Sequence, residues 1–85
     1  MATSSIPFIP TLNATLYGGD MNEVPAGVVY INNNPNNAPT ATGAYFVITT
    51  RYSNHAVQLA IRRDGDSIYA RRMSSGNWAA WYRVV

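Results

Sequence analysis

The sequence predicts an all-β domain, built as a small antiparallel meander sheet. From Gly43 onward, four runs rich in β-branched and aromatic residues follow one another without a long connection between them. The dipeptides that separate these runs are typical of tight turns: Ser53-Asn54, Asp64-Gly65 and Ser75-Gly76. No segment shows the apolar period of an amphipathic helix. We therefore predict a single β module over residues 18–85.

The N-terminal half is less regular. Residues 1–17 contain Pro7 and Pro10 and show little alternation, which favours an extended arm or linker. The Gly, Asp and Pro residues that follow predict a turn region, and the segment GVVYI then predicts a short strand. Residues 31–43 are rich in Asn and Pro. We interpret them as a solvated connector, with a sugar-contacting loop as the alternative, because Asn amides bond sugar hydroxyls.

The tight turns set strand registers that can be checked against one another. The first two turns produce two wholly apolar cross-strand rows on one face: Phe46–Ile61–Ile68 and Ile48–Leu59–Ala70. We predict that this face forms the core. The third turn extends the second row to Trp81, which would lie over the small Ala70 as a core tryptophan. Trp78 falls on the opposite face, across from Met73.

The opposite face mixes aromatic rings, arginines and a few polar groups, and such a surface generally marks an interaction site. We predict its site residues as Tyr45, Gln58, Arg62, Tyr69, Arg71, Trp78 and Tyr82. Two interpretations remain open. In one, the face packs against another chain or against the arm, through Ile6, Phe8 and Ile9. In the other, it binds a sugar, whose apolar faces stack on Trp and Tyr while Arg and Gln bond its hydroxyls.

The composition limits how the domain is stabilised. A chain of 85 residues forms a marginal core, and with 0 Cys it has neither disulfides nor thiolate metal ligands. Its 1 His, His55, does not by itself make a transition-metal site. Association with other chains is the remaining means of stabilisation, so we expect a homo-oligomer.

The charge and hydropathy patterns limit the partners. The formal net charge is +2, and all 6 basic side chains are Arg. Arg51, Arg62 and Arg71 are grouped only loosely with aromatic residues, so nucleic acid stays a minor alternative. No apolar run has membrane-spanning length, and MATSSIPFIP lacks the basic start and long apolar stretch of a signal peptide. We therefore expect no membrane insertion.

Catalysis and bound metal are not expected. Glycoside hydrolysis needs two carboxylates in one cleft, whereas the 4 acidic residues fall in predicted turns: Asp20, Glu23, Asp64 and Asp66. Ser74 and Ser75 also belong to a turn, and no acidic partner is implied for His55. The segment Asp64-Gly65-Asp66 could offer carboxylates to Ca²⁺, but turn chemistry explains it better. We predict no enzyme activity, no cofactor and no metal site.

Most of the chain, from about residue 18 to 83, resembles the pyocin-knob type domains of bacteriophage and pyocin tail fibres. GGDMNEVPAGVVYI is similar to their "D-x-N … G-x-Y" opening. Three further elements follow in the order and spacing of that family: Val57-Gln58, then Ile68-Tyr69 with Arg71, then Gly76, Trp78 and Trp81 as "G-x-W-x-x-W". Each motif alone is degenerate, and their order is what carries the resemblance.

The resemblance implies a virion-associated tail fibre protein, assembled as a homotrimer and acting outside the cell at the bacterial surface. It implies a host-surface polysaccharide or lipopolysaccharide as the partner. The function we expect is therefore non-catalytic attachment of a phage or phage-like particle to a host-surface glycan. The alternative is a structural trimerisation or spacer module of a fibre that has no ligand of its own.

Overall fold

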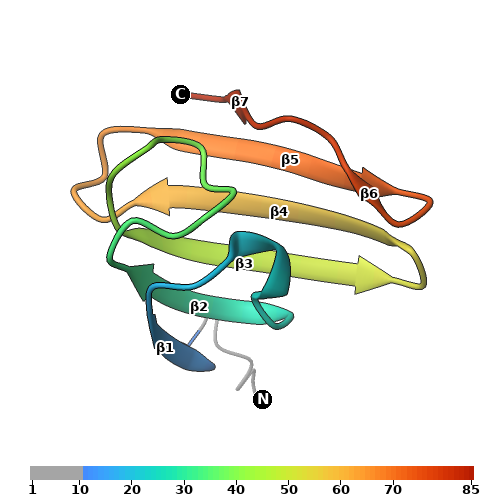
Figure 1. The fold of residues 1–85 in the computed structure, drawn as a ribbon, viewed down its shortest axis with the longest axis horizontal. Helices are drawn as coiled ribbons and strands as arrows, with labels where there is room; N and C mark the ends of the chain where they lie inside the picture. The colour runs from blue at the N-terminus through green and yellow to red at the C-terminus, as the bar shows by residue number, and fades with distance from the viewer. Residues whose placement is uncertain (1–10) are drawn as a thin grey trace, which may run out of the picture.

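A computed structural model describes residues 11–85, which form one twisted sheet of seven strands (Figure 1). Six strands follow the order β1-β2-β3-β4-β5-β6, and β7 pairs with β5. The predicted contacts of Ile6, Phe8 and Ile9 lie outside the described residues. The elements are β1 Ala14–Tyr17, the 3₁₀ helix η1 Met21–Glu23, β2 Gly27–Asn32, β3 Tyr45–Tyr52, β4 His55–Arg62, β5 Ile68–Ser74, β6 Asn77–Trp78 and β7 Tyr82–Arg83.

The all-β prediction is confirmed, but the sheet is mixed and not purely antiparallel. Strand β1 pairs in parallel with β2, matching Ala14 with Val29 and Leu16 with Ile31. The chain leaves β1, passes through η1 and returns in the same direction, as a parallel pair requires. The sheet therefore begins at Ala14, within the segment predicted as an arm. No helix among residues 11–85 is long and apolar enough to cross a membrane.

The predicted registers of β3, β4 and β5 are confirmed. Phe46 pairs with Ile61 and Ile48 with Leu59, and Leu59 in turn faces Ala70. The turn geometry differs from expectation at Asp64-Gly65, where only the glycine has a positive φ, of 76°. Ser75-Gly76 is the pair with positive φ at both residues, 53° and 82°, as a type I′ turn requires.

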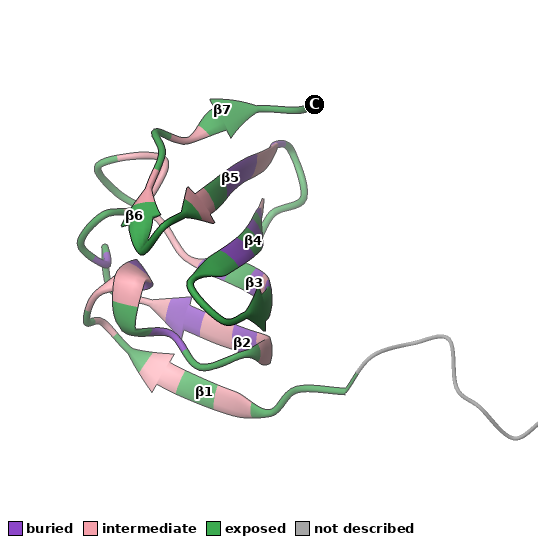
Figure 2. Cartoon of the chain, turned by 90° about the vertical axis from the view of Figure 1, so that its right-hand side faces the viewer, coloured by how far each residue is buried: buried purple, intermediate pink, exposed green. Residues whose placement is uncertain are grey.

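The buried face of the sheet is the opposite of the one predicted. Tyr45, Val47 and Ala60 are fully buried, whereas Phe46 and Leu59 each remain 37% exposed. In β3 and β4, buried residues alternate with partly or fully exposed residues (Figure 2). We call the side of Tyr45, Val47 and Ala60 the covered face, and the side of Phe46, Ile48, Leu59, Ile61 and Ile68 the open face.

Two segments distant in sequence from β3 and β4 decide which face is covered. Helix η1 places Met21 and Val24 against the core, together with Val29 and Ile31 of β2. The Asn-rich loop, residues 33–44, lies on the same side of the sheet as η1 (Figure 1). The main-chain N–H of Met21 joins the two by donating to the carbonyl of Asn36 over 2.9 Å. The apolar rows of the open face have no such cover from the described chain.

The position of Trp81 also differs from the prediction. Ala70 pairs with Tyr82, and not with Trp81, although Met73 still faces Trp78 as predicted. Between these two pairings the chain contains one extra residue, which is a β-bulge in the span of residues 79–81. A one-residue slip reverses the faces. Trp81 therefore joins Trp78 on the covered face, and Tyr82 moves to the open face.

Candidate functional site

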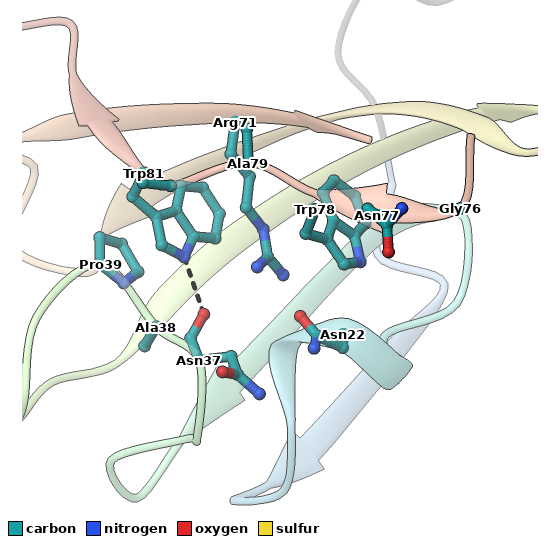
Figure 3. Close-up of a pocket in the computed structure, with 11 residues that line it drawn as sticks. Asn22, Asn37, Ala38, Pro39, Arg71, Gly76, Asn77, Trp78, Ala79 and Trp81 are labelled. Atoms are coloured by element: carbon teal, nitrogen blue, oxygen red, sulfur yellow. Dashed lines mark hydrogen bonds between the residues drawn. The ribbon is translucent and has the colours of Figure 1, made fainter. Parts of the chain in front are cut away.

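The centre of the candidate site is Arg71, which lies between the two tryptophans of the chain (Figure 3). The guanidinium carbon is 4.1 Å from the ring centroid of Trp78 and 4.5 Å from that of Trp81. Arg71 comes from β5 and Trp78 from β6, while Trp81 comes from the bulge. The bulge is thus what allows both indoles to reach the same cation, an arrangement that favours a guanidinium.

A series of hydrogen bonds between buried polar groups fixes the position of Arg71. Its Nε donates to Oε1 of Gln58 over 2.8 Å. The amide nitrogen of Gln58 donates to Oγ1 of Thr49 over 3.0 Å and to the main-chain oxygen of Met21 over 3.2 Å. Thr49, Gln58 and Arg71 are at most 4% exposed. Gln58 therefore positions Arg71 and links it to η1.

The opposite wall of the site comes from η1 and the Asn-rich loop. Nε1 of Trp81 donates to the main-chain oxygen of Asn37 over 2.7 Å. The Asn37 amide donates to Oδ1 of Asp20 over 2.8 Å, and that oxygen also accepts from the N–H of Asn22 over 2.8 Å. Between these walls lies an open pocket of about 670 Å³, lined by Asn22, Asn37, Ala38, Pro39, Arg71, Gly76, Asn77, Trp78, Ala79, Ala80 and Trp81.

Burial and hydrogen bonds shift the pKa values of two charged side chains at the site, Arg71 and Asp20. Burial lowers the pKa of Arg71 from its ordinary value to about 10; nearby Asp20 opposes this change and Arg51 adds to it. Arg71 therefore stays a cation at neutral pH. The pKa of Asp20 is lowered by the bond from the Asn37 side chain and by the main-chain N–H of Asn22, so Asp20 is an anion there.

Three buried polar atoms of the pocket have no hydrogen-bond partner among the described residues. They are Nη2 of Arg71, Nε1 of Trp78 and Oδ1 of Asn22. All three residues line the same pocket. Native proteins leave few buried polar groups unsatisfied, because each costs about 1–3 kcal/mol. Two donors and one acceptor gathered in one pocket indicate a place for a polar ligand.

The structure separates the seven predicted site residues. Arg71 and Trp78 line the pocket, Gln58 lies behind Arg71, and Tyr69 packs against the core. Tyr45 and Arg62 lie at the far end of the sheet, where both contact Thr40. Tyr82 is on the open face and 62% exposed. The structure thus brings only two of the predicted residues into the pocket.

Sequence reasoning missed Trp81 and the loop side of the pocket. The sequence places Trp81 over Ala70, because nothing in residues 77–81 signals a bulge. Trp81 does pack against the core, but from the covered face, where it also lines the pocket. Asn37, Ala38 and Pro39 belong to the loop interpreted as a connector, and Asn22 to a turn. The available signals were the alternative interpretation of the Asn-rich segment as a sugar-contacting loop and two motifs of the family resemblance, "D-x-N" and "G-x-W-x-x-W", which contain Asn22 and Trp81.

The described residues contain no group of three or more His, Asp or Glu side chains placed to hold a metal ion. Asp64 and Asp66 lie beside Nε of Arg62, at 3.7 and 3.5 Å. These ion pairs join side chains of one hairpin, and the two carboxylates are more than half exposed. The hairpin charges are therefore explained by pairing within the turn.

Comparison with known proteins identifies two similar solved structures, both of pyocin fibres. One is an N-truncated R2-type pyocin tail fibre, with a TM-score of 0.76 and 24% identity over 93% of this chain. The other is a C-terminal part of the P. aeruginosa R2 pyocin fibre, with a TM-score of 0.77, 24% identity and the same coverage.

The chain spans 34% and 24% of the length of those two fibre chains. No protein-family model matches the sequence, and no curated protein matches it. At this identity the likeness shows the fold alone. The chain therefore has the fold of a segment found in pyocin tail fibres.

Proposed function

We propose that this chain is a non-catalytic tail fibre module that attaches a phage or phage-like particle to a host-surface glycan, at the pocket around Arg71. The observation that carries the proposal is the pair of indoles that flank a buried guanidinium whose outer nitrogen has no partner in the described chain. The fold shared with two pyocin fibre segments supports the particle context, outside the cell at the bacterial surface.

The pocket has the mixture of groups that carbohydrate binding requires. Trp78 and Trp81 are half-buried, so each leaves part of its ring surface in the pocket. Indole surfaces pack against the apolar C–H faces of sugars. Arg71 between the indoles, and Asn22 and Asn37 on the opposite wall, supply donors and acceptors for sugar hydroxyls. Both walls come from packed elements, so the pocket is largely preformed.

Binding to an array of bacterial surface polysaccharides and lipopolysaccharides tests the proposal. We expect Trp78→Ala and Trp81→Ala to weaken binding at least tenfold. Tyr17→Ala, an exposed aromatic on β1 at the other edge of the sheet, is the matched control and should bind as the parent does. Because the pocket holds both tryptophans, glycan binding should also change the tryptophan fluorescence of the parent chain. Unchanged binding by both tryptophan variants would place attachment elsewhere.

The open face favours a second function, self-association within a fibre. Its apolar rows continue onto β2, where Val28 pairs with Ile48 and the ring of Tyr30 lies 5.1 Å from that of Phe46. Contiguous apolar surface of this kind commonly marks an interface. We propose a further copy of the chain as its occupant, because a short chain without disulfides has a marginal core that association would complete. The family resemblance implies three copies.

Light scattering of the parent chain beside Leu59→Glu tests self-association. We expect a parent mass of three chains and a fall to one chain in the variant. Trp78→Ala, on the covered face, should keep the parent mass. A monomeric parent at high protein concentration would leave the open face without this role.

A further inference from the structure

We infer that the pocket takes a sugar that carries a carboxylate, and that this carboxylate binds the outer end of the Arg71 guanidinium. The inference rests on the proposed glycan attachment and adds the chemical class of the glycan. Three observations support it: Arg71 is a buried cation without a bonded carboxylate, unpartnered donors lie beside it, and the charges around it are mostly positive.

Arg71 is a buried cation without a carboxylate bonded to it. It is 4% exposed, and its hydrogen bond within the described chain runs from Nε to the neutral amide of Gln58. By contrast, Arg62 has two carboxylates within 4 Å at a more exposed position. Burying a charge is costly unless an opposite charge or several hydrogen bonds compensate. The flanking indoles offset part of that cost, and an anionic ligand would offset more.

The free donors have the arrangement that a carboxylate requires. With Nε bonded to Gln58, the two Nη atoms form the fork that Arg uses for bidentate contacts with carboxylates. The guanidinium extends between the indoles toward the wall formed by Asn22 and Asn37 (Figure 3). Nη2 of Arg71 and Nε1 of Trp78 are both buried without a partner among residues 11–85, and Oδ1 of Asn22, which also lacks a partner there, is an acceptor for a neighbouring sugar hydroxyl.

The charges nearby also favour an anion. Arg51 lies over Trp78, with 5.7 Å between its guanidinium carbon and the ring centroid, and adds a second cation beside the pocket. Asp20 is the acidic side chain that interacts with Arg71. Oδ1 of Asp20 already accepts bonds from Asn22 and Asn37. The two cations, Arg71 and Arg51, therefore outnumber the one carboxylate that interacts with Arg71, which leaves a net positive site.

A matched pair of sugars tests the inference: tetragalacturonate and the neutral tetrasaccharide made from it by carboxyl reduction. The readout is the ¹H–¹⁵N spectrum of the parent chain, in which each tryptophan contributes one indole N–H signal. We expect tetragalacturonate to shift the Trp78 signal and to bind at least tenfold more tightly than its neutral partner. Galactose 6-phosphate beside galacturonate separates a carboxylate site from a general anion site.

Arg71→Gln tests the residue itself, because glutamine keeps polar contacts and removes the charge. We expect this variant to bind the acidic and neutral sugars equally. Arg62→Gln, at the other end of the sheet, should keep the preference of the parent. Equal binding of the acidic and neutral sugars by the parent, or tighter binding of the phosphate, would overturn the carboxylate inference and leave glycan attachment in place. If neither tetrasaccharide binds and the polysaccharide array is also blank, both proposals are wrong.

Discussion

The two faces of the sheet differ in a way that reverses a simple expectation from hydropathy. The covered face carries Thr49, Gln58 and Arg71 in its interior, whereas the open face carries Phe46, Ile48 and Leu59 with part of their surface in water. The covered face is buried because η1 and the Asn-rich loop pack on it. The difference shows that a covering segment, and not the apolar content of a row, determines which side of a small sheet becomes the interior.

The comparison also separates two kinds of interaction surface. The covered face ends in a concave pocket with directed donors and acceptors, which suits a small polar ligand. The open face is a sheet surface with apolar side chains in register, which suits a second protein surface. The two interpretations considered for a single face at the sequence level are thus proposed for opposite sides of the molecule.

The largest effect is expected from placing a charge on each face in turn. Ala60 is fully buried on the covered face, and its neighbour Leu59 is on the open face. We expect Ala60→Glu to unfold the domain, with a loss above about 4 kcal/mol, because a buried charge has no partner there. Leu59→Glu should stay folded. Circular dichroism with urea titration measures both, and unfolding of Leu59→Glu to the same extent would contradict the assignment of the faces.

The next effect tests the polar interior of the covered face. Gln58→Leu removes the acceptor of Arg71 Nε and the donor to Thr49 and to the Met21 carbonyl. We expect a loss of about 3 kcal/mol in the free energy of unfolding, since a buried cation and two other polar groups lose their partners. Val57→Ala, at an exposed position on the same strand, should cost less than about 1 kcal/mol. Equal losses in urea titrations would mean that this series of hydrogen bonds does not stabilise the fold.

A smaller effect distinguishes the two tryptophans. Trp81→Phe keeps an aromatic ring but removes the bond from Nε1 to the carbonyl of Asn37. We expect a loss of about 1 kcal/mol and faster amide exchange in the Asn-rich loop. Nε1 of Trp78 has no partner in the described chain, so Trp78→Phe should be close to neutral in stability. The reverse order in thermal unfolding would assign the anchoring role to Trp78.

The smallest effect is a pH dependence at the edge of the pocket. The pKa of Asp20 lies below its ordinary value of 3.8, first through the Asn37 side chain and then through the N–H of Asn22. A lowered carboxyl pKa contributes stability that is present above the unfolded-state value and is lost as the pH falls through the folded-state value. In urea titrations at pH 7, Asp20→Asn should therefore be less stable than the parent. The free energies of unfolding of the two proteins should converge in strong acid. A constant difference down to pH 2 would contradict this role.

Local sequence signals were sufficient for the central strands. Two-residue turns specify which residues face each other, because side chains alternate and any slip would scatter the apolar rows. The pairs Phe46–Ile61 and Leu59–Ala70 follow from that rule alone. The pairing of Met73 with Trp78 follows from the third turn in the same way. The candidate site residues Arg71 and Trp78 could be identified from the sequence for the same reason, because the register determines the face on which they lie.

The site as a whole was not predictable from such signals. The bulge before Tyr82 has no turn residue to mark it, so the face of Trp81 could not be deduced. Two residues complete the pocket on the side of η1 and the Asn-rich loop. Asn37 carries no motif that distinguishes it from ordinary turn residues, and Asn22, although part of the "D-x-N" motif of the resemblance, was interpreted only as a turn residue. Their placement depends on bonds to Asp20 and Trp81 that join segments far apart in the chain.

The sequence by itself determined the all-β class, the order of the central strands and their register, because these depend on alternation and on turns of two residues. Only the tertiary structure decided which face is covered and that Arg71 lies between two indoles. The physical reason is the distance along the sequence over which each feature is determined. Register is set by neighbouring residues, whereas burial depends on where η1 and the Asn-rich loop pack.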